Sequence, residues 1–309
     1  MLGDVASVGP TVPDEVRALL ARHVASRGHP GLSESRLRAL DAAARNGGGL
    51  VAVAARRAGD GALVGWAQVD DGADGRDPTL EVVALGDDPT DDGTLVGQLA
   101  EAVLDALGTG GDEPVRWWVT HATDADDARA EARDFRIERD LLQLRCPLPL
   151  PGRDDRAAHP PVATRSFRVG HDEAGWLAQN NRAFAHHPEQ GDWDLPTLLE
   201  REQEAWFDPD GFRVLEVDGR IAGSCWTKVH ATEPPLGEVY VIGVDPDFHG
   251  RGWGRALTQA GFDWLAGAGL SHGMLYVDAA NTPAVALYRS LGLTTHHVDR
   301  AYVRGPAAG

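Results

Sequence analysis

Residues 241–255 read VIGVDPDFHGRGWGR, a run of strand-forming residues followed by a glycine-rich turn and the start of a helix. The glycines at 250, 252 and 254 let backbone N–H groups approach an anion, and the N-terminal end of the following helix adds partial positive charge. Arg251 and Arg255 add formal charge. The segment is either a flexible turn or a cradle for a pyrophosphate. It is not a Walker loop, because no Gly-Lys-Ser/Thr follows, and it comes too late in the chain, after a hairpin, for a dinucleotide-binding fingerprint.

Strands and helices alternate around this segment. Asp218-Gly219 is a hairpin signal, Asn281 and Pro283 mark a helix start, and Gly269 and Gly292 mark helix ends. The predicted strands are 212–217, 221–229, 237–244, 273–278 and 294–303, and the predicted helices start at Trp253 and span 284–291. The order indicates an α/β fold with a mixed (α+β) sheet.

The chain also contains an internal repeat. His29-Pro30 recurs as His187-Pro188, and the segment around Glu81 resembles the segment around Glu238, about 157 residues further along. We therefore predict two copies of one domain, residues 1–150 and 162–309, joined by a proline-rich linker at 151–161.

Composition excludes several classes of function. Of 309 residues, 29 are Lys or Arg and 47 are Asp or Glu, and the net charge of −18 argues against nucleic acid or an anionic membrane as a partner. The two cysteines are too few for a disulfide framework or a cysteine zinc site, and the histidine pairs have the wrong spacing for a metal site, so we expect no metal. Cys225 is expected to be a small buried strand residue. With no signal-peptide pattern and no membrane-spanning stretch, we expect a cytoplasmic monomer.

Residues 249–254, His-Gly-Arg-Gly-Trp-Gly, resemble the pyrophosphate motif Q/R-x-x-G-x-G/A of the GNAT acetyltransferase superfamily, with His249 in the usual Gln or Arg position. Residues 281–293 resemble its N-x-x-A-x-x-x-Y-x-x-x-G-F signature. The resemblance implies two tandem GNAT domains and acetyl-CoA as the acetyl donor. The residues that it implies for acetyl-CoA are Ile242, Gly243, Val244, His249, Gly250, Arg251, Gly252, Trp253, Gly254, Arg255, Asn281, Thr282, Pro283, Ala284, Val285 and Ala286.

Four further strings resemble the mycothiol synthase family within this superfamily. They are HPEQG at 187–191, AWFDPDG at 205–211, WTKVH at 226–230 and GEVYV at 237–241. The resemblance covers the second half strongly and the first half loosely. It implies acetylation of the cysteinyl amine of desacetylmycothiol, a cysteinyl-glucosaminyl-inositol, giving mycothiol and CoA. The residues implied for this substrate are Glu34, Glu189, Lys228, Glu238 and Tyr276.

Acetyl transfer to an amine needs a base for the ammonium, a donor for the developing oxyanion and an acid for the leaving thiolate. Glu238 precedes the cradle on its strand, six residues before Val244, so the two side chains share a face unless a bulge intervenes. We predict Glu238 as the base and a backbone N–H near Val244 as the oxyanion donor. The resemblance implies Tyr288 as the acid. Without a catalytic role, Glu238 would be a carboxylate on a solvated face of the strand, and Tyr288 would be a half-buried aromatic residue on an amphipathic helix.

The first copy lacks the features of the cradle. By the repeat, the cradle maps onto residues 92–97, where Thr94 replaces Arg251 and Leu95 replaces Gly252. Four aspartates at 87, 88, 91 and 92 surround this segment and should repel a pyrophosphate. We therefore expect the first copy to be inactive and to bind CoA weakly or not at all.

Two alternatives remain open on the residues alone. One is a GNAT enzyme for another amine, such as an aminoglycoside or a peptide N-terminus. The other is a non-catalytic CoA-binding protein, because one copy is degenerate.

Overall fold

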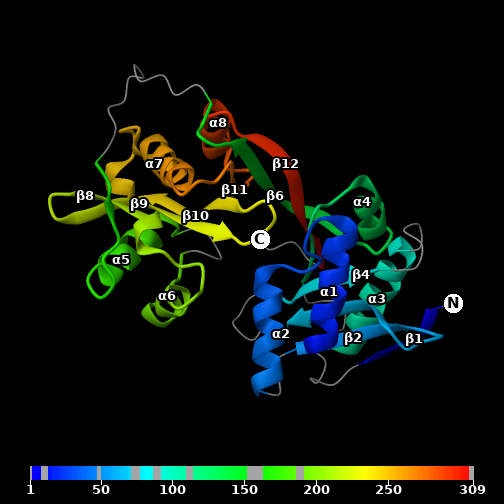
Figure 1. Cartoon of the computed structure of the whole chain (residues 1–309). Coiled ribbons are helices and arrows are strands. Elements are labelled where there is room, and N and C mark those ends of the chain that lie inside the picture. Colours follow the sequence, from blue (N-terminus) through cyan, green and yellow to red (C-terminus); the bar gives the residue numbers. More distant parts are fainter. Residues whose placement is uncertain are drawn as a thin grey trace. The chain divides into compact units, whose positions relative to one another are not determined.

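The structure is a computed structural model that describes residues 2–7, 13–46, 50–70, 77–85, 92–108, 114–151, 163–185 and 191–305. The chain forms two compact units, Met1–Leu141 with His297–Gly309, and Leu142–His296 (Figure 1). Each unit has a sheet with helices on both faces. The α/β class and the mixed sheet agree with the sequence prediction.

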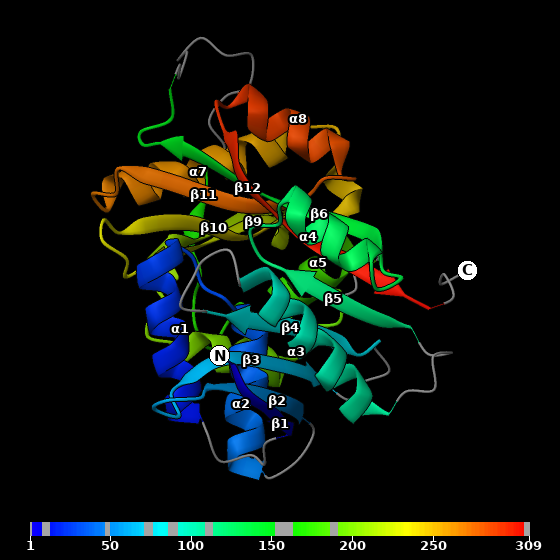
Figure 2. The ribbon, with the colours of Figure 1, turned by 90° about the vertical axis from the view of Figure 1, so that its right-hand side faces the viewer.

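In the first unit the strands follow the order β1-β2-β3-β4-β5-β12. They are β1 (Leu2–Ser7), β2 (Leu50–Arg57), β3 (Leu63–Asp70), β4 (Thr79–Ala84), β5 (Val115–Val119) and β12 (Thr294–Arg304). The helices are α1 (Pro13–Arg27), α2 (Glu34–Asn46), α3 (Asp92–Leu107) and α4 (Asp124–Glu131). Side chains alternate across the sheet: Val53 and Ala55 pack under α3, and Ala52 and Ala54 pack under α1 and α2. Figure 2 shows the ribbon of these strands and helices.

In the second unit the strands follow the order β6-β11-β10-β9-β8-β7. They are β6 (Arg136–Pro147), which begins in the first unit, β7 (Arg165–Ser166), β8 (Phe212–Val217), β9 (Arg220–His230), β10 (Leu236–Val244) and β11 (His272–Asp278). The helices are α5 (Glu173–Ala183), α6 (Leu195–Glu202), α7 (Trp253–Gly267) and α8 (Thr282–Ser290). The predicted strands and helices of this half are confirmed, with shifts of one or two residues at their ends.

The two faces of this second sheet have different cores. On one face Cys225, Val239 and Leu275 pack against α7 and α8. On the other face Trp226 and Val241 pack with Trp176 of α5 and Leu198 of α6. Figure 1 shows α7 on one side of β9 and β10 and α5 and α6 on the other. The edge of β10 therefore lies between the α7–α8 face and the α5–α6 face of the sheet, so a ligand at this edge could meet groups from both faces.

The unit boundaries differ from those that the sequence suggested. The second half of β12 belongs to the first unit, because Arg300 to Arg304 pair antiparallel with Val119 to Val115 of β5. β6 likewise passes from the first unit into the second after Leu141. Of the predicted linker, residues 152–161 lie outside the described residues.

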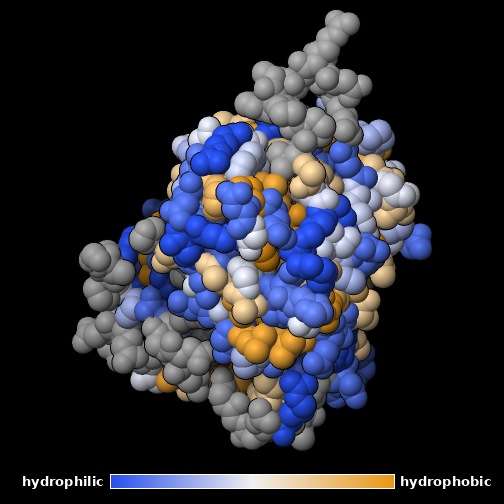
Figure 3. All heavy atoms as spheres, turned by 90° about the vertical axis from the view of Figure 1, so that its left-hand side faces the viewer, coloured by the Kyte–Doolittle hydropathy of each residue, from blue (hydrophilic) through white to orange (hydrophobic). Residues whose placement is uncertain are grey.

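Hydrophilic side chains predominate on the face in Figure 3, and hydrophobic ones form small separate patches. This agrees with a chain in which acidic residues far outnumber basic ones. Among the described residues, no helix is long and apolar enough to span a bilayer.

Candidate active site

A β-bulge divides β10 and sets the geometry of the predicted site. The pairing with β9 shifts between Val239 and Val241, which places Tyr240 and Val241 together on the α5–α6 face. Val244 consequently packs with the α7 core, while Glu238 is on the α5–α6 side. The prediction that Glu238 and Val244 share a face is therefore wrong, and the bulge is the reason.

β10 pairs with its parallel neighbour β11 over only part of its length. The pairing of β10 with β11 runs from Gly237↔Gly273 to Val239↔Leu275, and within the described residues it extends no further. Beyond Val239, the edge of β10 that faced β11 has backbone N–H and C=O groups available to an extended ligand. Ile242, Gly243 and Val244, all half-buried, lie on this stretch.

The glycine-rich turn continues directly from that edge. Gly250 and Gly252 have φ of 77° and 76°, in the left-handed region where glycine is favoured, and Gly252 caps α7. A Cβ on Gly250 would meet nothing within 4 Å, and one on Gly254 would meet only Leu287, at 3.8 Å. The first turn of α7 is therefore open, and its N–H groups have no intrahelical partners. This fits the predicted pyrophosphate cradle.

Side chains in the turn fix its shape. His249 Nε2 donates to Val244 O at 2.9 Å, and the Arg251 guanidinium lies 5.2 Å from the Trp253 ring. Arg255 donates to the Ser290 hydroxyl on α8. These contacts connect the turn to the end of β10 and to α8.

Asp245 connects the turn to α5. Its buried carboxylate accepts from Arg182 Nε at 3.0 Å and from Asp247 N at 3.0 Å. Burial alone would raise the pKa of Asp245, but the Asp247 N–H and the Arg182 guanidinium lower it below its usual value. Asp245 therefore stays ionised and holds the end of β10 in place.

On the α5–α6 face, Glu238 has two neighbours on β9. It pairs in register with Lys228, and its Oε2 lies 2.6 Å from Nε2 of His230, two residues further along. Both Glu238 and Lys228 are buried, at 7% and 6% exposure. The sequence prediction identified Glu238 and Lys228, whereas His230 received no role although it ends the WTKVH string.

Lys228 lies in an aromatic environment. Its Nζ is 4.7 Å from the centre of the Trp206 ring and 5.4 Å from that of Tyr240. Both distances fall in the range of cation–π contacts. The Trp206 Nε1 is buried and has no hydrogen-bond partner among the described residues, so the indole presents an unused donor beside Lys228. Trp206 is part of the AWFDPDG string, which predicted no role for it.

Tyr288 lies on the opposite face. It is 7% exposed and packs in the core that also contains Cys225. Burial, with a smaller contribution from Cys225, raises the pKa of Tyr288 well above its usual value, so the phenol keeps its proton at any physiological pH. Cys225 itself is buried, as predicted, and burial raises the pKa of its thiol to about 12.

Tyr276 extends the row of polar groups along the sheet. It lies on β11, where it is 38% exposed, and its hydroxyl accepts from Gln143 Nε2 of β6 at 2.7 Å. Gln143 in turn accepts from Arg145 Nε at 2.7 Å. The register places Tyr276 on the same face as Met274 and hence as Glu238.

The other predicted residues have mixed outcomes. Asn281 caps α8 by accepting from Ala284 N at 3.2 Å, and Thr282, Pro283 and Ala286 are exposed at the start of that helix. Ala284 is half-buried, and the Val285 side chain belongs to the core. Glu34 lies in the first unit and forms an ion pair with Arg38 at 3.4 Å. Glu189 lies outside the described residues.

The corresponding helix start in the first unit is covered by arginines. Arg129 Nε of α4 donates to Gly93 O at 3.0 Å, and a Cβ on Gly93 would lie 2.8 Å from Arg129 Nη2. A Cβ on Gly97 would lie 2.2 Å from Arg133. Glu81, at the repeat position of Glu238, accepts from both N and Oγ of Ser33. The Glu81 carboxylate and the Gly93 carbonyl are thus engaged in contacts within the first unit.

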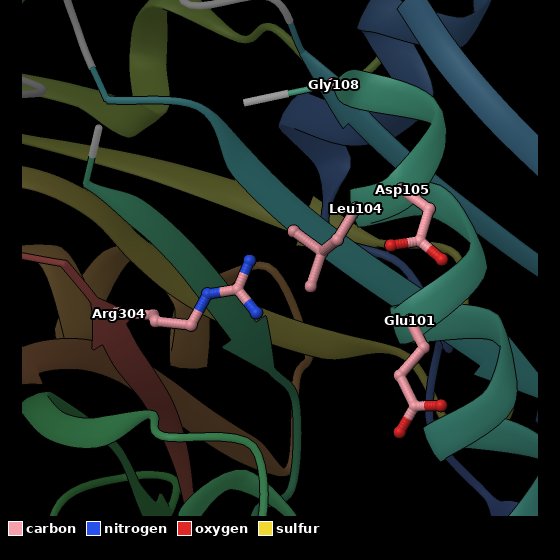
Figure 4. Close-up of a pocket in the computed structure, with 5 residues that line it drawn as sticks. All are labelled: Glu101, Leu104, Asp105, Gly108 and Arg304. Atoms are coloured by element: carbon pink, nitrogen blue, oxygen red, sulfur yellow. The ribbon is translucent and has the colours of Figure 1, made fainter. Parts of the chain in front are cut away.

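The surface of the described residues has hollows away from the glycine turn. One, of about 450 Å³, lies in the first unit, where Arg304 of β12 faces Glu101, Leu104 and Asp105 of α3 (Figure 4). Another, of about 360 Å³, lies between α5 and the β8–β9 turn, next to Asp245. The first contains none of the predicted site residues, so its size does not indicate the reaction site.

Residues 179–293 match the family model described as Acetyltransferase (GNAT) family. A mycothiol acetyltransferase of Acidimicrobium ferrooxidans is 46% identical over 74% of this chain and 75% of that protein. The chain belongs to the mycothiol acetyltransferase family. A member from Geodermatophilus obscurus is 39% identical over 98% of both chains, so the family likeness includes both units. The chain is thus a GNAT acyltransferase.

Solved structures agree on the fold. A GCN5-related N-acetyltransferase from Sphaerobacter thermophilus has a TM-score of 0.69 at 23% identity and covers 99% of this chain and 96% of its own. A tandem GNAT protein from the clavulanic acid biosynthesis pathway has a TM-score of 0.62 at 15% identity, with full coverage of both chains. The two units therefore form a tandem GNAT fold.

Proposed function

We propose that the second unit transfers an acetyl group from acetyl-CoA to the cysteinyl amine of desacetylmycothiol. The observation that carries this proposal is the open edge of β10, which continues into the glycine turn and has Glu238 on one face of the sheet and Tyr288 on the other. Family membership supports the acceptor.

The residues present fit acetyl-CoA. The edge of β10 from Ile242 to Val244 offers backbone groups to the pantetheine arm, as an added strand would. The turn from His249 to Arg255 and the first turn of α7 offer N–H groups and positive potential to the pyrophosphate. The start of α8 from Asn281 to Ala286 is a further contact surface. When bound, acetyl-CoA supplies the activated thioester carbonyl.

Proton transfers are divided between the two faces. Glu238 takes a proton from the acceptor ammonium, directly or through one water, which leaves the amine free to form the N–C bond as the C–S bond breaks. Tyr288 donates a proton to the departing thiolate from the α7–α8 face. A phenol whose pKa is raised by burial remains protonated for this role. A backbone N–H near Val244 is the proposed oxyanion donor.

Recognition of the acceptor falls to the α5–α6 face. Lys228 and Tyr276 lie in one row with Glu238, and their ammonium and hydroxyl groups suit a sugar–inositol ligand rich in hydroxyls. Glu189 and Glu34 are further proposed contacts. The first unit has Thr94 and Leu95 at the cradle positions of Arg251 and Gly252, with four aspartates around them, and it is proposed to be inactive and to bind CoA weakly or not at all.

A thiol-release assay with acetyl-CoA and a panel of acceptors tests the proposal. Desacetylmycothiol should give rapid turnover, and glucosamine, an aminoglycoside and a short peptide should give little. Turnover with only one of the other amines would show that the acceptor is not desacetylmycothiol, although the reaction would still be acetyl transfer. Binding of acetyl-CoA without turnover on any acceptor would contradict the proposal.

A further inference from the structure

The carboxylate of Glu238 is not isolated. His230 Nε2 lies 2.6 Å from Glu238 Oε2, which is the length of a charge-assisted hydrogen bond. The side chain of Glu238 is 10% exposed and that of His230 is 28% exposed. His230 therefore lies between the buried carboxylate and the solvent.

We propose that His230 and Glu238 act as one proton-accepting unit, in which Glu238 takes the ammonium proton and His230 passes it to water. The inference rests on the proposed function, since it assigns a second residue to the step given there to Glu238. Glu238 is the catalytic residue, and His230 is a relay that acts through it.

The proton balance of acetyl transfer requires such an exit. An ammonium acceptor loses two protons as it becomes an amide, and the leaving thiolate takes up only one. The other must reach solvent. A buried carboxylate that kept this proton would be unable to accept another in the next turnover. The step starts from the imidazole tautomer with its proton on Nδ1, in which Nε2 accepts the proton that Glu238 has taken and an imidazolium–carboxylate pair forms. The imidazolium then releases its Nδ1 proton to water, and proton exchange with water returns the ring to the first tautomer before the next turnover.

An imidazole suits this position because it has two nitrogens on opposite edges, so that one can accept a proton while the other gives one up. Other charged or titratable groups on this face surround the pair. Lys228 lies beside His230 on β9, Tyr276 and His272 lie on β11, and Arg145 lies on β6. Lys228 and Arg145 carry positive charge, which opposes retention of the proton on the imidazole and so favours its release.

Two substitutions separate a relay from a merely structural histidine. His230→Gln retains an N–H donor for the Glu238 carboxylate but cannot carry a proton. His230→Ala leaves space for free imidazole. His171→Ala is the matched control, because His171 is an exposed histidine of the same unit before α5. Glu238→Gln reports on the proposed function itself.

We expect kcat of both His230 variants to fall at least tenfold, with an unchanged KM for acetyl-CoA and an unchanged melting temperature. The assay uses a low buffer concentration, so that the buffer does not take over the proton transfer. Added imidazole should restore several-fold of the activity of His230→Ala, and His171→Ala should behave as the wild type. Wild-type turnover and pH profile in His230→Gln would overturn the relay, and so would a loss in His230→Ala that imidazole does not restore. Full activity of Glu238→Gln would instead remove Glu238 from the base role, and absence of turnover in the wild type would refute the proposed function, so these failures are distinguishable from failure of the relay.

Discussion

Gly250→Ala tests whether the backbone of the glycine turn holds acetyl-CoA. Gly250 has a φ of 77°, and its added methyl group would meet nothing within 4 Å. The substitution thus introduces backbone strain without a steric clash. A non-glycine residue in the left-handed region costs about 1–2 kcal/mol.

Whether this strain lowers the stability of the protein or its affinity for acetyl-CoA depends on how tightly the turn is packed. Gly250 and Arg251 are both exposed, so the turn has little tertiary packing to keep its conformation and should relax to a negative φ. Binding of acetyl-CoA then has to restore the original conformation. Since about 1.4 kcal/mol corresponds to a tenfold change in affinity, we expect the Kd for acetyl-CoA to rise about 5- to 30-fold.

The assay is calorimetric titration of acetyl-CoA, with the KM for the acceptor and the melting temperature measured in parallel. Gly267→Ala is the control, because Gly267 lies at the other end of α7, lacks a positive φ and also has nothing within 4 Å of an added Cβ. The control should bind acetyl-CoA like the wild type. An unchanged affinity in Gly250→Ala, with unchanged stability, would refute the assignment of this turn to the pyrophosphate.

Three other predictions concern the acid, the first unit and the number of sites. Tyr288→Phe should lower kcat by about 10²-fold or more with little change in acetyl-CoA affinity, as measured by steady-state kinetics, because the buried phenol is the proposed acid; wild-type turnover would remove Tyr288 from that role. Burial raises the pKa of Glu81 to about 7 from a usual value near 4.5, so the folded state binds the proton more tightly, and stability should fall as pH rises from about 4.5 to 7, by up to about 3 kcal/mol. Glu81→Gln should abolish that dependence in thermal unfolding at pH 5 and pH 8, and an identical pH dependence in the variant would contradict the burial argument. Calorimetry with CoA should show one strong site per chain, since aspartates at 87, 88, 91 and 92 lie around the segment of the first unit that corresponds to the cradle; two sites of similar affinity would show that this acidic loop does not prevent binding.

The sequence predicted the parts of the site that depend on local interactions. The glycine turn follows from residues that tolerate a positive φ, and the start of α8 follows from the capping Asn281, so both were identified from consecutive residues. The repeat likewise indicated that Glu81 and Glu238 occupy equivalent strands.

The remaining features depend on pairing between distant segments. The bulge at Tyr240 depends on the register of β10 with β9, and no residue in β10 indicates it by itself. The contacts of His230 with Glu238 and of Trp206 with Lys228 join different segments, so the strings that contain these residues gave no roles for His230 and Trp206. The pairing of β12 with β5 joins residues almost 190 positions apart. Because of this pairing the C-terminal end of the chain belongs to the first unit, which the proline-rich segment alone did not indicate.

The most direct test of the account is the identity of the product and its dependence on both faces of the sheet. Wild-type protein, Glu238→Gln and Tyr288→Phe would each be incubated with isotopically labelled acetyl-CoA and desacetylmycothiol, and the products would be analysed by mass spectrometry. The account predicts one labelled acetyl group on the cysteinyl nitrogen for each CoA released, with a strongly reduced rate in both variants. Label on another atom, or undiminished labelling of the nitrogen in either variant, would contradict it.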